Sequence, residues 1–265
     1  MKTESAILIE TTAGLSSAVS GKHDRIYFGH ETCERRIPSS AELNEAKKFC
    51  NKNGFALSLM TPFCTNSGLK KIRPLLNLLS KQDEVIVNDF GILKTVSEKS
   101  KAEPVCGRLL NRQYRDPRIA EFKNAPKPML EHLSKSHTST PQFISLLKSF
   151  GVKRAELDNL LQGIGTDLAG TGFKASLYFP LVFISATRLC LTANCTSFSK
   201  AKNIGIFPCK KECIEFSFRL ENPEFKQPLY LIGNALYFKN NSMPKELFKK
   251  GIDRIVTSEK LPPSE

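Results

Sequence analysis

Eight short runs of β-branched and aromatic residues, separated by segments with helical spacing, constrain the fold of this chain more than any other feature. The runs lie at 6–10, 25–29, 55–61, 84–88, 103–107, 153–157, 174–184 and 253–257. Strands that alternate with helices favour a parallel sheet, and eight strands are the number that closes as a barrel. We therefore predict an α/β fold, a (β/α)8 TIM-barrel-like single domain over residues 1–265. An open doubly wound sheet is the alternative.

The helix between the second and third strands has readable ends. Ser39 and Glu42 have the spacing of a capping box, in which each side chain accepts a hydrogen bond from the other residue's backbone. Gly54 supplies the left-handed residue that commonly follows the last turn. We therefore predict a helix that begins after Ser39 and ends before Gly54.

Two regions interrupt the alternation of strands and helices. Residues 108–139 are polar and contain several prolines, which predicts a long loop with one or two helical turns. Residues 214–240 hold two apolar, β-rich runs around the polar sequence ENPEFKQ. We expect these runs to form an inserted β-hairpin before the last strand.

Nothing in the sequence predicts a membrane-bound or secreted protein. No stretch of eighteen apolar residues occurs, and the apolar patch near the N-terminus is too short and too acidic for a signal peptide. We therefore expect a cytoplasmic protein. In a reducing compartment, thiols stay free or bind metal rather than forming disulfides.

The eight cysteines are more than a chain of 265 residues needs in order to fold. Four of them, Cys190, Cys195, Cys209 and Cys213, lie within 24 positions. Thiolates are ligands of zinc and of iron–sulfur clusters. Residues 187–213 are therefore predicted to be a cysteine-rich, metal-binding segment.

The predicted barrel places an early cysteine near this segment. Cys33 follows the second strand, and the late cysteines follow the seventh, so both belong to loops at the C-terminal face of the barrel. Cys64 and Cys106 also follow strands and are further candidates. Cys50 lies on the apolar face of its helix and is predicted to be a core residue.

Three sequence motifs follow one another over nearly the whole chain: IYFGHETCERR, VNDFG, and ISATRLCLTANC with PCKKEC downstream. Their order resembles the collagenase-like (U32-type) peptidase family, and within it the UbiV-type iron–sulfur proteins of anaerobic ubiquinone biosynthesis. The resemblance implies a [4Fe-4S] cluster on Cys33, Cys190, Cys209 and Cys213. It also implies a UbiU-type partner subunit in a heterodimer, with a role in oxygen-independent hydroxylation of ubiquinone (quinone) precursors.

Two departures from the family pattern bear on the ligand set. The interval from Cys190 to Cys209 is longer than the family pattern has, and Cys195 is an additional thiol. Cys195 is therefore the reserve ligand in place of Cys33. A zinc ion on Cys190, Cys195, Cys209 and Cys213 is the alternative, which would make the protein a zinc-binding, non-catalytic module.

Peptidase activity is disfavoured. The peptidase members of the family carry a His-Gly pair before the first late cysteine, and this chain has Thr187 and Arg188 there. The nucleophile motif G-x-S-x-G and the zinc-protease motif H-E-x-x-H are also absent from the sequence. The chain is therefore expected to be a subunit of an O2-independent hydroxylase, and no catalytic residue is assigned.

Four polar residues follow predicted strands and would face the mouth of the barrel. Asn88 and Asp89 follow the fourth strand, and Arg108 and Asn111 follow the fifth. They are candidates to contact an anionic or phenolic substrate through charge-assisted hydrogen bonds. Polar capping of strand ends is the alternative interpretation.

The formal charge of +13 raises a second possible partner. Residues 107–128 contain six Lys and Arg, including Arg112, Arg115 and Arg118, around the aromatic Tyr114. Cations bind phosphates and an aromatic ring can stack on a base, so this segment is a candidate RNA-contacting surface. The alternative function is therefore an iron–sulfur RNA-hydroxylation factor of the same family.

Overall fold

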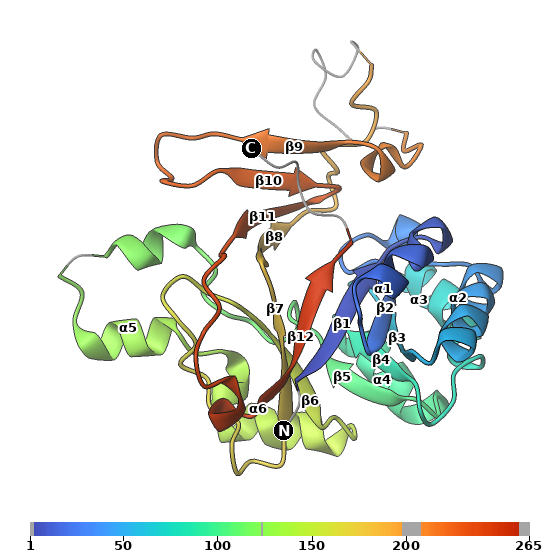
Figure 1. Cartoon of the computed structure of the whole chain (residues 1–265), viewed down its shortest axis with the longest axis horizontal. Coiled ribbons are helices and arrows are strands. Elements are labelled where there is room, and N and C mark those ends of the chain that lie inside the picture. The colour runs from blue at the N-terminus through green and yellow to red at the C-terminus, as the bar shows by residue number, and fades with distance from the viewer. Residues whose placement is uncertain (1–2, 123, 198–207, 260–265) are drawn as a thin grey trace.

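The computed structural model describes residues 3–122, 124–197 and 208–259, which form a barrel and a second sheet (Figure 1). The barrel strands are β1 (Glu4–Ile9), β2 (Arg25–Gly29), β3 (Ala56–Met60), β4 (Glu84–Val87), β5 (Glu103–Cys106), β6 (Arg154–Asp158), β7 (Lys174–Tyr178) and β12 (Ile252–Ser258). Within the described ranges these eight strands close in the order β1-β12-β7-β6-β5-β4-β3-β2, and every pair is parallel. The predicted (β/α)8-type fold is confirmed.

Helices connect most consecutive strands of the barrel. They are α1 (Ser17–Ser20), α2 (Ser40–Asn53), α3 (Asn66–Leu76), α4 (Phe90–Lys99), α5 (Lys127–Leu133) and α6 (Pro141–Ser149). The predicted capping box of α2 is present: Ser39 Oγ accepts from Glu42 N at 3.2 Å, and Glu42 Oε2 accepts from Ser39 N at 2.7 Å. The helix ends at Gly54, whose φ of 75° is the left-handed conformation that glycine adopts without strain.

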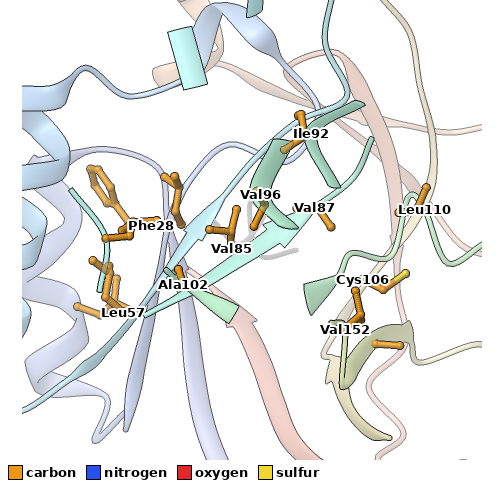
Figure 2. Close-up of a cluster of buried hydrophobic side chains, with 14 of the residues drawn as sticks. Phe28, Leu57, Val85, Val87, Ile92, Val96, Ala102, Cys106, Leu110 and Val152 are labelled. Carbon is orange, nitrogen blue, oxygen red and sulfur yellow. The ribbon is translucent and has the colours of Figure 1, made fainter. Parts of the chain in front are cut away.

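The main hydrophobic core lies between the barrel and its helices. Outward-facing strand residues such as Phe28, Leu57 and Val85 pack with Ile92 and Val96 of α4 in this cluster (Figure 2). Each fully buried side chain of this size contributes about 1.5–3 kcal/mol to folding. The contacts between strands and helices therefore stabilise the barrel. The strand ends lie outside this core and can carry polar groups.

Two of the eight cysteines belong to this core. Cys50 on α2 and Cys106 at the end of β5 are both buried in it. Burial raises the pKa of the Cys50 thiol to about 12, so it stays protonated at neutral pH. The prediction that Cys50 is a core residue is confirmed, and Cys106 has the same role.

The predicted seventh strand, residues 174–184, is two strands. β7 ends at Tyr178, and after Phe179 and Pro180 the chain continues as β8 (Leu181–Ala186) in the second sheet. Three further strands complete that sheet: β9 (Ser217–Leu220), β10 (Leu229–Ile232) and β11 (Ala235–Lys239). Its order is β8-β11-β10-β9, with all pairs antiparallel.

The insertion predicted at residues 214–240 is therefore present, but it is not a single hairpin: its second apolar run forms both β10 and β11, and β8 pairs with β11. Figure 1 shows this sheet beyond the ends of β7 and β12, which is the C-terminal side of the barrel strands. Loops from the barrel and turns from the second sheet can meet there. Among the described residues, no helix is long and apolar enough to cross a membrane.

Candidate metal centre

A cavity of about 190 Å3 lies at the C-terminal end of the barrel. Cys33, Cys190, Cys209 and Cys213 all line it, and we call it the cysteine pocket. Its walls come from the loop after β2, the chain after β8 and the turn between β10 and β11. The structure therefore brings together the four cysteines that the resemblance implies as ligands, from segments up to 180 positions apart.

A sharp turn at the end of β2 sets the position of Cys33. Gly29, the last residue of that strand, has φ of 124°, and a Cβ there would lie 2.6 Å from the carbonyl oxygen of Met60. Only glycine allows the two backbones to approach so closely. The chain then turns toward the pocket, and Cys33 precedes the single 3-10 turn η2 (Glu34–Arg36).

Asn234 ties the walls of the pocket together. Its Nδ2 donates to the carbonyl oxygens of Thr32 at 2.9 Å and Thr187 at 2.8 Å, and its Oδ1 accepts from Thr32 Oγ1 at 2.7 Å. One side chain in the β10–β11 turn thus holds the residue before Cys33 and the segment that leads to Cys190. No motif in the sequence points to Asn234, because only the folded sheet brings it beside these loops.

His30 organises the same loop from inside. Its Nδ1 accepts hydrogen bonds from the backbone N–H groups of Thr32 at 3.2 Å and Cys33 at 3.1 Å. The ring proton therefore lies on Nε2, which faces Glu10 Oε1 at 3.6 Å. His30 acts here on the backbone of the cysteine loop.

Each of the four cysteine sulfur atoms has a polar partner, which for Cys33 is the backbone N–H of Arg35. Arg36 Nη1 donates to Cys213 Sγ at 3.2 Å, and the backbone N–H of Lys211 donates to Cys209 Sγ at 3.4 Å. Cys190 Sγ lies 3.1 Å from Thr192 Oγ1. The N–H donors on Cys213 and Cys209 stabilise thiolate more than thiol, and the charged guanidinium of Arg36 does so most.

The Arg36 side chain is itself fixed. Its Nη2 donates to Glu10 Oε2 at 3.3 Å, and the two side chains are only 4% and 13% exposed. Because the Arg36 guanidinium is buried and bonded to both a carboxylate and a sulfur atom, its orientation is fixed. Arg35 and Arg188 also line the pocket but are exposed.

The thiols of the pocket repel one another when they ionise. Burial raises the pKa of Cys33, and negative charge on Cys213, Cys190 and Cys209 raises it further, while a hydrogen bond from the Arg35 backbone lowers it. The four sulfurs therefore share one electrostatic environment. A bound cationic group would relieve this repulsion and deprotonate the thiols.

The reserve ligand Cys195 has a different position. It is partly buried, its backbone N–H donates to the carbonyl oxygen of Thr192 at 3.1 Å, and it is not among the described residues that line the cysteine pocket. Cys64 also does not line it. Burial, followed by the charges of Asp89 and Glu34, raises the pKa of Cys64 to about 11.

The cysteine pocket is wider than a site for one ion. Among the described residues, no group of three or more His, Cys, Asp or Glu side chains is placed to hold a single metal ion. Zinc with four thiolates at about 2.3 Å would need sulfur atoms within about 4 Å of one another. The four thiols instead surround the cavity.

The substrate-contact candidates after β4 are engaged within the fold. Asn88 Nδ2 donates to the carbonyl oxygen of Thr61 at 3.0 Å, and its Oδ1 accepts from the backbone N–H of Leu109 at 3.0 Å. Asp89 caps α4 by accepting from the N–H groups of Gly91 and Ile92. These contacts fit the capping interpretation, and contact of Asn88 or Asp89 with a substrate stays a prediction.

The two candidates after β5 are buried. Arg108 donates to both carboxylate oxygens of Glu31 and to Asp158 Oδ1, each at 2.7 Å, and its guanidinium lies 3.8 Å from the centre of the Tyr178 ring. Asn111 Nδ2 donates to the carbonyl oxygen of Glu156 at 3.0 Å. Arg108 therefore ties four loops and strands together at the barrel mouth, and substrate contact by Arg108 or Asn111 also stays a prediction.

The arginines of the candidate RNA surface differ in their environments. Arg115 is buried and donates to Asp158 Oδ2 at 2.6 Å, while Arg118 pairs with Asp116 at 2.6 Å. Within the described part of the chain, Arg112 is the one of the three without an ion pair, and it is exposed. Carboxylates therefore neutralise two of these three arginines, and contact of this segment with RNA stays a prediction.

Comparisons with known proteins add little to this geometry. No family model and no curated protein matches the chain. One crystal structure, of an uncharacterized B. cereus protein, aligns with 92% of this chain and 91% of its own length at 13% identity, with a TM-score of 0.25. Neither its overlap nor its description indicates a function.

Proposed function

We propose that this protein binds a [4Fe-4S] cluster through Cys33, Cys190, Cys209 and Cys213. The observation that carries the proposal is the convergence of these four thiols on one cavity. Four cysteine thiolates are the usual ligands of such a cluster. A cavity of about 190 Å3 between them has room for a group of several atoms, which favours a cluster over a single zinc ion.

The surroundings of the thiols also fit the negative charge that a positively charged cluster core and its four thiolates carry together. A cluster with four thiolate ligands carries net negative charge, so nearby cations and N–H donors stabilise it and set its potential. Arg36 and the Lys211 backbone already donate to two of the sulfurs, and Arg35 and Arg188 contribute positive charge at the wall. These residues would therefore stabilise the reduced form of the cluster and raise its reduction potential.

When bound, the cluster would supply one-electron transfer. The chain's own residues would fix its position and limit the access of water. Asn234 and His30 hold the cysteine loop through backbone contacts, and Phe63 and Ala193 supply apolar parts of the wall. An apolar wall with few fixed donors keeps the effective dielectric low.

We further propose, from the resemblance, a role in oxygen-independent hydroxylation of ubiquinone precursors together with a UbiU-type subunit. Thr187 and Arg188 stand where the peptidase members of the family carry His-Gly. Thr187 Oγ1 accepts from the backbone N–H of Leu189 at 3.1 Å, and Thr187 N donates to the carbonyl oxygen of Asn234 at 3.0 Å. This residue therefore shapes the turn that leads to Cys190.

Purification without oxygen tests the cluster. We expect a brown protein with iron and acid-labile sulfide at about four of each per chain. Cys33→Ala should lose the cluster, whereas Cys195→Ala should keep it, since Cys195 lies outside the pocket. A colourless protein with one tightly held zinc, or loss of the metal in Cys195→Ala only, would overturn the proposal in favour of the zinc module.

The metabolic role is tested separately, in cells that make ubiquinone without oxygen. Deletion of the gene should stop a hydroxylation step, and the wild-type chain should restore it while Cys33→Ala should not. Restoration by Cys33→Ala would remove the cluster from the reaction, even if the purified protein holds iron.

A further inference from the structure

A second cavity, of about 500 Å3, lies away from the cysteine pocket in the segment between β5 and α6. Its lining comes from residues 112–114 and 132–140, and we call it the cationic cleft. The segment includes α5 and projects from the side of the barrel (Figure 1). None of its lining residues belongs to the cysteine pocket.

The floor of the cationic cleft is fixed by backbone pairing. Gln113 and Ser136 form an antiparallel bridge, and His137 N donates to the carbonyl oxygen of Arg112 at 3.1 Å. The Gln113 side chain accepts from Asp158 N at 2.7 Å, which anchors this floor to the end of β6. The cleft is thus attached to the barrel and does not depend on an isolated loop.

Positive charge converges on the cleft without a compensating acid. Arg112 and Lys135 line it, no Asp or Glu is among its lining residues, and neither cation has an ion pair with another described residue. Burial lowers the pKa of His137, and the charge of Arg112 lowers it further. Because Arg112 and Lys135 line the same cavity, a bound anion would be attracted to both.

The cleft also offers an aromatic surface. Tyr114 is 47% exposed, and its hydroxyl lies 3.1 Å from Nε2 of His132. The two ring centroids are 5.4 Å apart at 53°, so the pair orients the Tyr114 ring at the rim. An exposed, oriented phenol ring beside two cations is suited to stack on a planar base whose phosphate reaches the cations.

We propose that the cationic cleft binds a phosphate-bearing ligand of mononucleotide size, with its phosphate on Arg112 and Lys135 and its base against Tyr114. A guanidinium matches phosphate oxygens with two parallel hydrogen bonds, and an ammonium adds a point charge. The volume of about 500 Å3 is within the usual range for small-ligand sites. The inference is independent of the cluster, because the two sites share no residue.

Calorimetric titration at low salt, with AMP, inorganic phosphate and adenosine as probes, tests this site. We expect AMP to bind more tightly than phosphate and adenosine to bind least. The double variant Arg112→Gln with Lys135→Gln should weaken AMP at least tenfold, since two charge-assisted contacts are lost. Tyr114→Leu should weaken AMP several-fold and leave phosphate unchanged.

Arg118→Gln is the matched control, because Arg118 is exposed nearby but pairs with Asp116 outside the cleft. It should bind AMP as the wild type does, and circular dichroism should show that all variants are folded. Absence of AMP binding, or equal AMP binding by the double variant and the wild type, would overturn the proposal. A single-stranded oligoribonucleotide that binds with steep salt dependence, when AMP does not bind, would identify an RNA surface instead.

Discussion

Two buried arginines at opposite ends of the barrel have different kinds of partner. At the N-terminal end, Arg254 donates to both oxygens of Glu84 at 2.8 and 2.9 Å and to Glu4 Oε2 at 2.7 Å. At the C-terminal end, Arg36 donates to Cys213 Sγ at 3.2 Å and to Glu10 at 3.3 Å. The Arg254 guanidinium is paired with carboxylates, whereas the Arg36 guanidinium lies in a pocket with four thiols.

Titratable groups in these two regions have pKa values shifted in opposite directions. Burial alone would raise the pKa of Glu84, but hydrogen bonds and charge from Arg254 and Arg25 lower it to about 2. For Cys33, burial raises the pKa and the neighbouring thiolates raise it further. At the base of the barrel, the protein's own arginines therefore neutralise the buried carboxylates. The thiols of the cysteine pocket instead favour a ligand that supplies positive charge.

The largest effect is expected at the base of the barrel. Arg254→Met should lower the free energy of unfolding by about 3–5 kcal/mol, because it removes three charge-assisted hydrogen bonds and leaves the buried Glu84 and the partly buried Glu4 with Arg25 as their remaining ion-pair partner. Urea denaturation measures this. Lys174→Met is the control: Lys174 is exposed and pairs with Asp253, so its loss should cost about 0–1 kcal/mol. Equal effects of the two substitutions would contradict the comparison.

The same ion pair should give a pH signature. The folded pKa of Glu84, about 2, lies below its ordinary value of 4.5, so its contribution is fully present above that value. The contribution, about 3 kcal/mol, should be lost as pH falls from 4.5 to 2. Between pH 5 and 2, the free energy of unfolding should therefore fall less with pH for Glu84→Gln than for the wild type. Urea denaturation at each pH measures this difference.

The next effect concerns Glu156, a buried carboxyl on β6 with no arginine bonded to it. Tyr178 donates to its Oε2 at 2.7 Å, and its Oε1 has no hydrogen-bond partner among the described residues. Burial raises its pKa to about 7. Between pH 4.5 and 7 the folded state therefore binds a proton that the unfolded state has released, and stability falls as pH rises.

Replacement of Glu156 by Gln should remove this cost. At pH 8 we expect the free energy of unfolding to rise by up to about 3 kcal/mol, since Gln keeps an acceptor for Tyr178 and carries no charge. The gain should shrink toward zero near pH 4. Glu98→Gln, on the exposed side of α4, is the control and should change stability little at either pH. A destabilised Glu156→Gln at pH 8 would show that the carboxylate is needed in charged form.

The smallest effect is expected at the cysteine pocket and rests on the proposed cluster. Arg36→Met removes a charged donor from Cys213, which should make the reduction potential more negative by about 60 mV, equivalent to a tenfold change for a one-electron couple. An anaerobic redox titration followed by electron paramagnetic resonance measures the shift. Arg35→Met should shift the potential less, because Arg35 is exposed and screened. An unchanged reduction potential in Arg36→Met would show that Arg36 does not set the potential of the cluster.

The sequence indicated the barrel because strand and helix periods are local properties. The capping box at Ser39 and the eight apolar runs survive in the fold almost residue for residue. The run 174–184 predicts one strand, since β7 and β8 are both apolar and continuous in sequence. Their separation depends on which neighbour each half meets: β12 and β6 for β7, and β11 for β8.

The candidate cysteines were also identifiable from the sequence, because thiol chemistry and position after a strand are both local. The polar candidates were less informative. Arg108 and Asn111 follow a strand as a substrate-binding residue would, and only the structure shows that their polar atoms bond to Glu31, Asp158 and the β6 backbone. The role of Asn234 likewise cannot be predicted from the sequence, because the residue belongs to no recognisable motif.

By itself, the sequence determined the number of barrel strands, the limits of α2 and the thiols available as ligands, because each follows from short-range spacing and side-chain chemistry. Tertiary structure decided which thiols share a cavity, which arginines are neutralised by carboxylates and where uncompensated positive charge remains. Those outcomes depend on contacts between residues up to 250 positions apart, such as Arg254 with Glu4. The energy of a charge is set by what surrounds it in space, and that environment exists only once the barrel has closed.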